Sequence, residues 1–118
     1  MEHIHLDFQE NPQGDVMVLS ITGKMMGGPE SQEVHTKVKN YLSQGIKKVV
    51  INFERVKWLN SSGIGILVAC LNTIQREGGQ LRLANLSGKD ESLFFMTNLI
   101  KVFSHHKSVG EAIASFSK

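Results

Sequence analysis

The sequence predicts an α/β protein with a mixed, mainly parallel sheet of four to five strands packed with about four helices. Strand-like segments, in which apolar residues alternate or run together, are interleaved with segments whose apolar residues recur at helical spacing. The joints between these segments are short and rich in glycine, asparagine and serine. A chain of 118 residues supports one hydrophobic core, so we expect a single domain over residues 1–118.

The first two strands are expected to pair as an antiparallel hairpin. Polar and apolar residues alternate over residues 3–8, which is typical of a half-buried strand. Residues 11–15 (NPQGD) have the composition of a turn, and residues 16–22 (VMVLSIT) are strand-like again. Gly23 is expected to end this second strand.

The first helix is expected to begin at Pro29 and to end before Gly45. Proline suits the first turn of a helix because its missing N–H would have no partner there, and glycine is the usual residue just past a helix end. Apolar residues recur at helical spacing between them, so the helix should be amphipathic, with Glu33, Lys37 and Lys39 facing water.

Residues 47–53 (KKVVINF) are expected to form a strand covered on both faces, because three β-branched apolar residues follow one another. A second helix should start near residue 61 and stop at Gly78, and a short strand should follow over residues 80–84. The inward face of that helix is predicted to consist of Ile64, Leu67, Val68, Leu71 and Ile74.

Two more helices and one short strand are expected in the last third of the chain. Ser87 can cap a helix that carries Phe94 and Met96, and Ser108 can cap the final helix. Residues 101–103, between these helices, are expected to form the last strand. Because helices separate the later strands, those strands should be parallel to one another.

The composition argues against several classes of protein. The formal net charge of +2 is too small for a nucleic-acid-binding surface, so no direct nucleic-acid partner is expected. No apolar stretch approaches the ~20 residues that cross a bilayer, and no apolar leader is visible, so we expect a cytoplasmic protein without a membrane partner. The one cysteine, Cys70, lies in an apolar run and is expected to be a buried, inert thiol.

One segment combines helix-capping residues with small residues, and it runs from Leu59 to Gly65 (LNSSGIG). Asn60 or Ser61 can accept a backbone N–H and so start the second helix. The small residues would let another protein approach the backbone closely. A phosphate on Ser61 would lie at a helix N-terminus, where the helix dipole favours it by roughly 0.3–1 kcal/mol. Serines at a helix start also act as caps alone, and this simpler role stays open.

The same segment does not match common catalytic patterns. A nucleophile elbow requires Gly-x-Ser-x-Gly, but Leu59 stands two residues before Ser61. A dinucleotide-binding fingerprint requires a third glycine where Val68 stands. We therefore expect no enzyme activity and no cofactor. A small-ligand or nucleotide-binding domain is an alternative that rests on the glycines at the helix start alone.

Residues 56–65 (VKWLNSSGIG) resemble the signature of STAS domains, the family of anti-sigma factor antagonists (anti-anti-sigma factors) of bacterial partner-switching systems. Residues 19–23 (LSITG) and 79–84 (GQLRLA) resemble the second-strand end and the fourth strand of that family. The order of the expected elements is also similar over nearly the whole chain. The resemblance therefore implies a STAS fold.

The resemblance also implies a mechanism of regulation. In that family a serine at the position of Ser61 is phosphorylated by a cognate anti-sigma factor, which is itself an ATP-dependent serine kinase. The unphosphorylated antagonist binds this kinase and frees a sigma factor, phosphorylation breaks the complex, and a serine phosphatase restores it. The protein would thus be a substrate and a binding partner rather than a catalyst, and we expect a monomer or a weak dimer.

A contact surface for the partner is predicted around the motif. Methionine adapts to other surfaces, so the loop at Met25 and Met26 can contact a partner, and Trp58 can anchor an interface. Packing of one methionine against the core, and of Trp58 against the sheet edge, are the alternatives. The predicted contact residues are Met25, Met26, Gly27, Trp58, Asn60, Ser61, Ser62, Gly63 and Ile64.

Two residues depart from the family pattern. Asn60 stands where the family has aspartate, and Met26 stands where an acidic residue often follows the second strand. Loss of these charges would either slow phosphorylation of Ser61, by removing groups that orient it, or ease it, by removing repulsion against the phosphate. The alternative function is an unphosphorylated STAS interaction module in a sensory or lipid-transport complex, or a weak nucleotide-binding STAS domain.

Histidine pairs occur at His3/His5 and at His105/His106. No aspartate, glutamate or cysteine joins them at a recognisable metal-ligand spacing. We therefore expect solvated or strand-face histidines and no metal site.

Overall fold

The computed structural model describes residues 6–117, so residues 3–5 of the first predicted strand, with His3 and His5, lie outside the described residues. Within the described range, five strands form one sheet in the order β1-β2-β3-β4-β5. The elements are β1 (Leu6–Gln13), β2 (Val16–Met25), α1 (Pro29–Ser43), β3 (Lys48–Leu59), α2 (Ser61–Arg76), β4 (Gln80–Ala84), α3 (Gly88–Met96), β5 (Ser104–His106) and α4 (Val109–Ser115).

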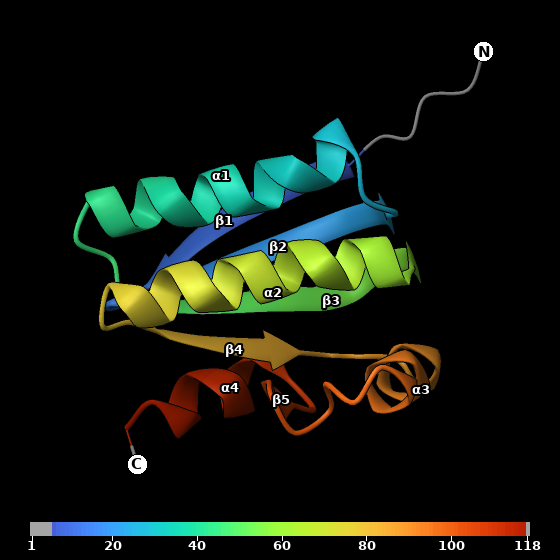
Figure 1. Ribbon diagram of the computed structural model, residues 1–118. Helices are drawn as coiled ribbons and strands as arrows, with labels where there is room; N and C mark the ends of the chain where they lie inside the picture. Colours follow the sequence, from blue (N-terminus) through green and yellow to red (C-terminus); the bar gives the residue numbers. More distant parts are fainter. Residues whose placement is uncertain (1–5, 118) are drawn as a thin grey trace.

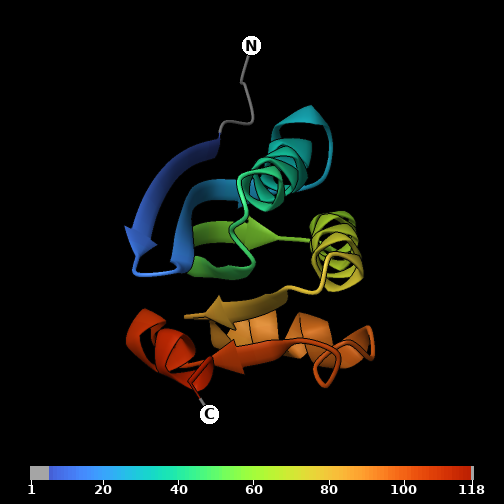
Figure 2. The ribbon, with the colours of Figure 1, turned by 90° about the vertical axis from the view of Figure 1, so that its left-hand side faces the viewer.

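The sheet is the central layer, with helices on both of its faces (Figure 1 and Figure 2). α1 and α2 lie side by side over one face, and α4 packs on the other. β1 is antiparallel to β2, and all the other neighbouring strands of the described sheet are parallel. The predicted α/β class, the mixed and mainly parallel sheet and the initial hairpin are confirmed.

The hairpin is longer than predicted, and its turn is tighter. β1 runs to Gln13, which pairs with Val16, so the turn contains only Gly14 and Asp15. The predicted turn over residues 11–15 was therefore wrong for its first three positions. Proline is compatible with β1 because this is an edge strand, where a missing N–H need not interrupt a ladder.

β2 and β3 also extend further than their apolar patterns indicated. The strand predicted to end at Gly23 runs to Met25, and the strand predicted over residues 47–53 runs to Leu59. Parallel pairing between the two strands, up to Met25 opposite Leu59, holds this more polar extension in the sheet. β4 ends much earlier, so the last part of β3 projects past it.

Apolar side chains form a core on each face of the sheet, a larger one under α1 and α2 and a smaller one under α4. Val49 and Ile51 enter the larger core and Val50 enters the smaller one, which confirms that β3 is covered on both faces here. Cys70 is fully buried in the larger core, as predicted. Desolvation raises the pKa of its thiol to about 12.

Both predicted serine caps are present. Ser87 Oγ accepts a hydrogen bond from Asp90 N–H at 3.0 Å, and Ser108 Oγ accepts one from Glu111 N–H at 3.1 Å. The Asp90 carboxylate in turn accepts from Ser87 N–H at 3.2 Å, which completes a capping box for α3. No helix within residues 6–117 is both long and apolar enough to cross a membrane.

The last strand lies later in the chain than predicted. β5 begins at Ser104, whereas a strand was expected over residues 101–103. Phe103 is buried, and its ring packs edge-to-face against that of Phe94 with 5.4 Å between centroids. The apolar residue that indicated a strand therefore joins the core between α3 and β5 instead of pairing in the sheet.

Candidate functional site

The predicted motif starts α2 at the edge where the parallel strands end. The carboxyl ends of β2 and β3 lie at this edge, and α1 and α2 both start from it (Figure 1). In parallel α/β sheets this is the usual place for binding sites. The fold thereby brings the loop after β2 beside the loop after β3, so that residues 34 positions apart in sequence touch.

Asn60 joins these two loops. Its side-chain oxygen accepts a hydrogen bond from Gly63 N–H at 2.8 Å, which makes Asn60 the N-cap of α2. Its side-chain N–H donates to the carbonyl oxygen of Met26 at 3.2 Å, and its backbone N–H donates to that of Met25 at 3.4 Å. An ionised aspartate has no side-chain donor for Met26, so asparagine makes a contact here that aspartate cannot make.

Two glycines allow the loops to touch. A Cβ on Gly63 would lie 2.2 Å from the carbonyl oxygen of Met25, so only glycine fits at this point of α2. Gly27 has a φ of +85°, and a Cβ there would lie 2.7 Å from the Cβ of Ser62. The start of α2 and the loop after β2 therefore form one closely packed surface.

Ser61 and Ser62 are exposed on this surface. The first intrahelical hydrogen bond runs from Ile64 N–H to the carbonyl oxygen of Asn60 at 3.0 Å. The N–H groups of the two serines come before that bond, so the helix does not use them. Together with the helix dipole they favour negative charge beside the serine hydroxyls.

The predicted contact residues differ in exposure. Met25 is fully buried and Ile64 is 2% exposed, so the prediction that their side chains contact a partner is corrected. These large apolar side chains pack into the core and support the surface from below. The exposed and half-buried members around the start of α2, which we call the helix-start surface, are Met26, Gly27, Asn60, Ser61 and Ser62.

Trp58 belongs to a second, neighbouring surface. Its side chain is 50% exposed, and Lys89 Nζ of α3 lies 4.2 Å from the centre of its ring. Trp58 lines a groove between the end of β3 and α3, together with Lys57, Lys89 and Met96. The structure thus divides the predicted contact residues between two surfaces.

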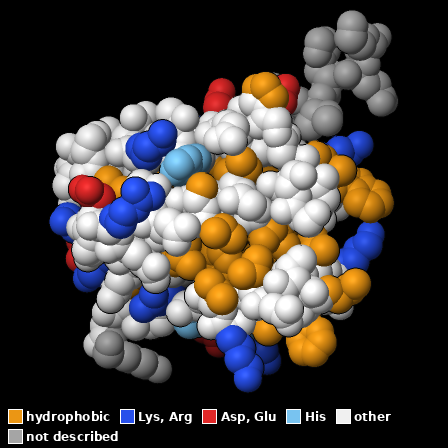
Figure 3. Space-filling view, viewed as in Figure 1, with side chains coloured by type: hydrophobic (Ala, Val, Ile, Leu, Met, Phe, Trp, Pro, Cys, Tyr) orange, Lys and Arg blue, Asp and Glu red, His pale blue; other side chains and the backbone are white. Residues whose placement is uncertain are grey.

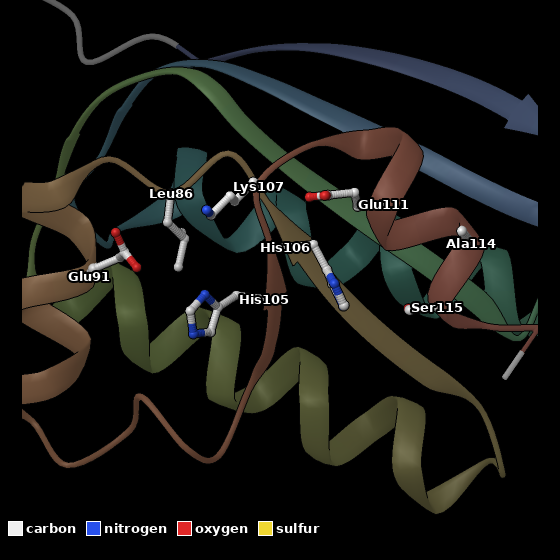
Figure 4. Close-up of a pocket in the computed structure, with 8 residues that line it drawn as sticks. All are labelled: Leu86, Glu91, His105, His106, Lys107, Glu111, Ala114 and Ser115. Carbon is white, nitrogen blue, oxygen red and sulfur yellow. The ribbon is translucent and has the colours of Figure 1, made fainter.

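His105 and His106 lie on opposite faces of β5. They pair with Leu83 and Ala84, which belong to the cores on the two different faces of the sheet. Both line a pocket of about 530 Å³ at this sheet edge, with His106 on the side of α4 (Figure 4). No group of three or more histidine, cysteine, aspartate or glutamate side chains within residues 6–117 is placed to hold a metal ion.

The sequence pattern of the family described as "STAS domain" matches residues 7–112. The chain belongs to the STAS domain family. The resemblance carried by the Asn60 to Gly65 motif is therefore confirmed, and the strand and helix order of the structure is that of a STAS domain.

Relatives of this STAS domain include an anti-sigma-B factor antagonist of Staphylococcus aureus. It is 28% identical over 71 residues, which are 60% of this chain and 63% of the relative. The match thus spans less than two thirds of the relative's length.

Several solved structures share the fold. An anti-sigma factor antagonist from Mycobacterium paratuberculosis gives a TM-score of 0.82 at 17% identity, covering 97% of this chain and 96% of that one. The phosphorylated form of the Bacillus cell fate determinant SpoIIAA gives 0.71 at 21% identity, covering 93% and 99%. A sulfate transporter family protein from Wolinella succinogenes gives 0.71 at 16% identity, covering 87% and 85%. At these identities the likeness establishes the fold of the STAS domain.

Most of the second surface was not predicted from the sequence. Phe95 and Met96 are 71% and 77% exposed, whereas Phe94 beside them is fully buried. Four large apolar residues in a row, Leu93 to Met96, were the available signal, because a helix on the outside of a sheet buries only one stripe of its surface. Which of these side chains stay outside depends on how α3 packs on the rest of the domain, where Phe94 meets the buried Phe103.

Proposed function

We propose that this STAS domain, spanning residues 1–118, is an anti-sigma factor antagonist. In this proposal it binds a cognate anti-sigma factor that is itself a serine kinase, and phosphorylation of Ser61 controls the binding. The observation that carries the proposal is the exposed Ser61 at the start of α2, on a surface held closely packed by Gly63. The protein acts as substrate and partner, and the catalytic groups belong to the kinase.

Names of similar proteins support this role. The Staphylococcus aureus relative is named an anti-sigma-B factor antagonist, and the SpoIIAA structures include a phosphorylated and an unphosphorylated form. A sequence relative thus carries the proposed role by name, and a protein of the same fold occurs in a phosphorylated form.

The local chemistry supports Ser61 as the phosphoacceptor. A phosphate there would add about −1.5 to −2 charge at pH 7, and the unused N–H groups at the start of α2 can donate to its oxygens. Asn60 is neutral and would not repel it. The buried Met25 and Ile64 support the surface underneath, so the modification changes its charge and bulk while the fold is kept.

The test is incubation with ATP and the histidine-kinase-like anti-sigma factors of the source organism, followed by intact-mass measurement. We expect the addition of one phosphate, and we expect Ser61→Ala to abolish it. Ser43→Ala removes another exposed serine, at the end of α1, and should be phosphorylated like the native chain. Phosphate addition that persists in Ser61→Ala would place the site elsewhere.

Binding provides the second readout. Ser61→Asp should weaken the affinity for the anti-sigma factor by roughly ten-fold or more, because it introduces a negative charge where the native chain presents a neutral hydroxyl. A serine phosphatase that removes the phosphate from the phosphorylated chain, and so restores its native mass, should restore its binding to the anti-sigma factor. The proposal further includes a cytoplasmic location. It also includes a monomeric or weakly dimeric state, which sedimentation of the purified chain tests.

A second candidate is an unphosphorylated STAS interaction module in a sensory or lipid-transport assembly. The observation that favours it is that both polar ends of the Asn60 side chain are used within the chain, by Gly63 and Met26. The side chain in front of Ser61 thus has a structural role and carries no charge that could orient the serine. Partner binding that is unchanged by both Ser61→Ala and Ser61→Asp would favour this candidate.

A further inference from the structure

α3 exposes large apolar side chains beside the helix-start surface. Phe95 and Met96 of α3 are 71% and 77% exposed, and Trp58 at the end of β3 is 50% exposed. We call these three side chains, with Lys57 and Lys89 beside them, the α3 surface. In Figure 3 apolar side chains extend from the middle of this face, below α2, to where Figure 1 places α3, and Lys and Arg side chains lie around their border. Contiguous apolar patches of this kind, with a polar rim, mark interaction sites in soluble proteins.

Two grooves run along this part of α3, one on each side of a shared ridge. The first, of about 320 Å³, lies between Trp58 and α3, and the second, shallower and more open, of about 470 Å³, lies between Phe95 and Ile100. Ser92 and Met96 line both grooves. Residues four apart on a helix form a ridge, and a second helix packs by placing its own ridges into the grooves on either side.

The groove beside Trp58 carries positive charge. Lys57 and Lys89 line it, and both are exposed. The one acidic residue on its wall, Asp90, is 7% exposed and turned inward to cap α3. The second groove has an exposed Glu91 instead, so the two sides of the ridge differ in charge.

The surface is already in place before any partner binds. α3 is anchored by the fully buried Phe94, whose ring packs against Phe103, and its first turn is fixed by the Ser87 capping box. The Lys89 ammonium group lies over the Trp58 ring. A rigid, preformed surface loses little conformational freedom on binding, which favours affinity.

We propose that this α3 surface binds an amphipathic helix of a partner protein. Large apolar side chains of that helix enter the two grooves, and acidic residues lie on the side that faces Lys57 and Lys89. The hollows on the two sides of the Ser92 and Met96 ridge can receive side chains of a partner helix. The proposal does not depend on phosphorylation of Ser61.

The chain provides its own probe, because Trp58 is its one tryptophan. The experiment titrates the native protein with a tryptophan-free helical peptide of about 18 residues, long enough to form a helix. The peptide has leucine and phenylalanine on one face and glutamate along one border of that face. We expect a saturable blue shift of Trp58 fluorescence at peptide concentrations below about 1 mM, because the half-exposed ring becomes covered.

Matched variants locate the site. Met96→Glu places a charge on the shared ridge and should weaken the binding at least ten-fold, and Lys89→Glu should weaken it similarly. Met96 and Lys89 are exposed, so far-UV circular dichroism should show an unchanged fold. Lys39→Glu makes the same charge change on the exposed side of α1 and should leave the affinity unchanged.

Each alternative occupant of the α3 surface predicts a different result in the fluorescence titration. A peptide with lysine in place of glutamate that binds equally well would overturn the charge argument. A blue shift with anionic phospholipid vesicles but not with the peptide would identify a membrane as the occupant. A shift that depends on protein concentration without any peptide would identify a second copy of this chain. Absence of a saturable change with the acidic peptide would overturn the proposal.

Discussion

The carbonyl oxygen of Met25 lies directly against the Cα of Gly63, so that a Cβ on Gly63 would be 2.2 Å away from it. This contact joins the end of β2 to the first turn of α2, and with the Asn60 side chain it holds the two loops of the helix-start surface together. The site therefore consists of backbone surfaces in close contact as much as of exposed side chains, and its first tests concern that contact.

Gly63→Ala should destabilise the fold by about 1–3 kcal/mol or more, because the new methyl group must push the Met25 carbonyl or α2 aside. Gly65 is the matched control, two residues later in the same helix, where a Cβ would meet nothing within 4 Å. Gly65→Ala should stabilise by roughly 0.5–1 kcal/mol. Urea unfolding with an unchanged m-value measures both. Equal effects of the two substitutions would contradict the close contact.

Asn60→Ala should lower the free energy of unfolding by about 1–3 kcal/mol, because it removes the N-cap of α2 and the hydrogen bond to Met26 together. Asn60→Asp should cost less, because a carboxylate still accepts from Gly63 N–H and is favoured by the helix dipole. Urea unfolding of the two variants and the native chain gives the order of their free energies of unfolding. A loss for Asn60→Asp as large as that for Asn60→Ala would mean that the cap is not what stabilises this site.

His35 should make stability depend on pH. Its Nε2 lies 2.8 Å from Thr73 Oγ1 between α1 and α2, and burial, with smaller effects from Lys39 and Arg76, lowers its pKa below 6.5. The unfolded chain then binds the proton more readily than the folded chain. The contribution of neutral His35 to the free energy of unfolding is therefore fully present above pH 6.5 and is lost as the pH falls below it. Urea midpoints at about pH 7.5 and 5.5 bracket this range.

His35→Gln is the control for that measurement. Glutamine cannot be protonated in this range, so the loss of stability between the two pH values should become smaller. Glu10, whose pKa is lowered from 4.5 chiefly by its hydrogen bond with Tyr41, titrates below the range. An identical pH dependence in the variant and the native chain would show that His35 does not contribute.

Cys70 should be unreactive toward thiol reagents in the folded protein. Its side chain is fully buried, and burial raises its pKa to about 12, so little thiolate is present and none is accessible at neutral pH. A chromogenic disulfide reagent should label the thiol at the rate of unfolding and immediately in denaturant. Labelling of the native protein within the mixing time would contradict this burial.

Much of the fold was predictable because local patterns agreed with the tertiary packing. The buried run Val49 to Ile51, the serine caps of α3 and α4 and most of the apolar face of α2 were correctly predicted. On that face of α2, Val68 is only partly buried, and the buried Ile66 was not predicted. The ends of β2 and β3 were not, because Lys24 and Trp58 remain in the sheet through pairing with each other across the two strands. A periodic pattern ends where apolar residues end, whereas a strand ends where its partner ends.

The sequence by itself determined the α/β class, the STAS motif and the position of Ser61 at a helix start, because these depend on periodicity, capping and a short run of residues. Only the tertiary structure decided that Met25 is buried while Met26 remains partly exposed, and that Trp58, Phe95 and Met96 border neighbouring grooves. The physical reason is that exposure is a property of what packs on a residue. The elements that cover or flank these side chains come from distant parts of the chain.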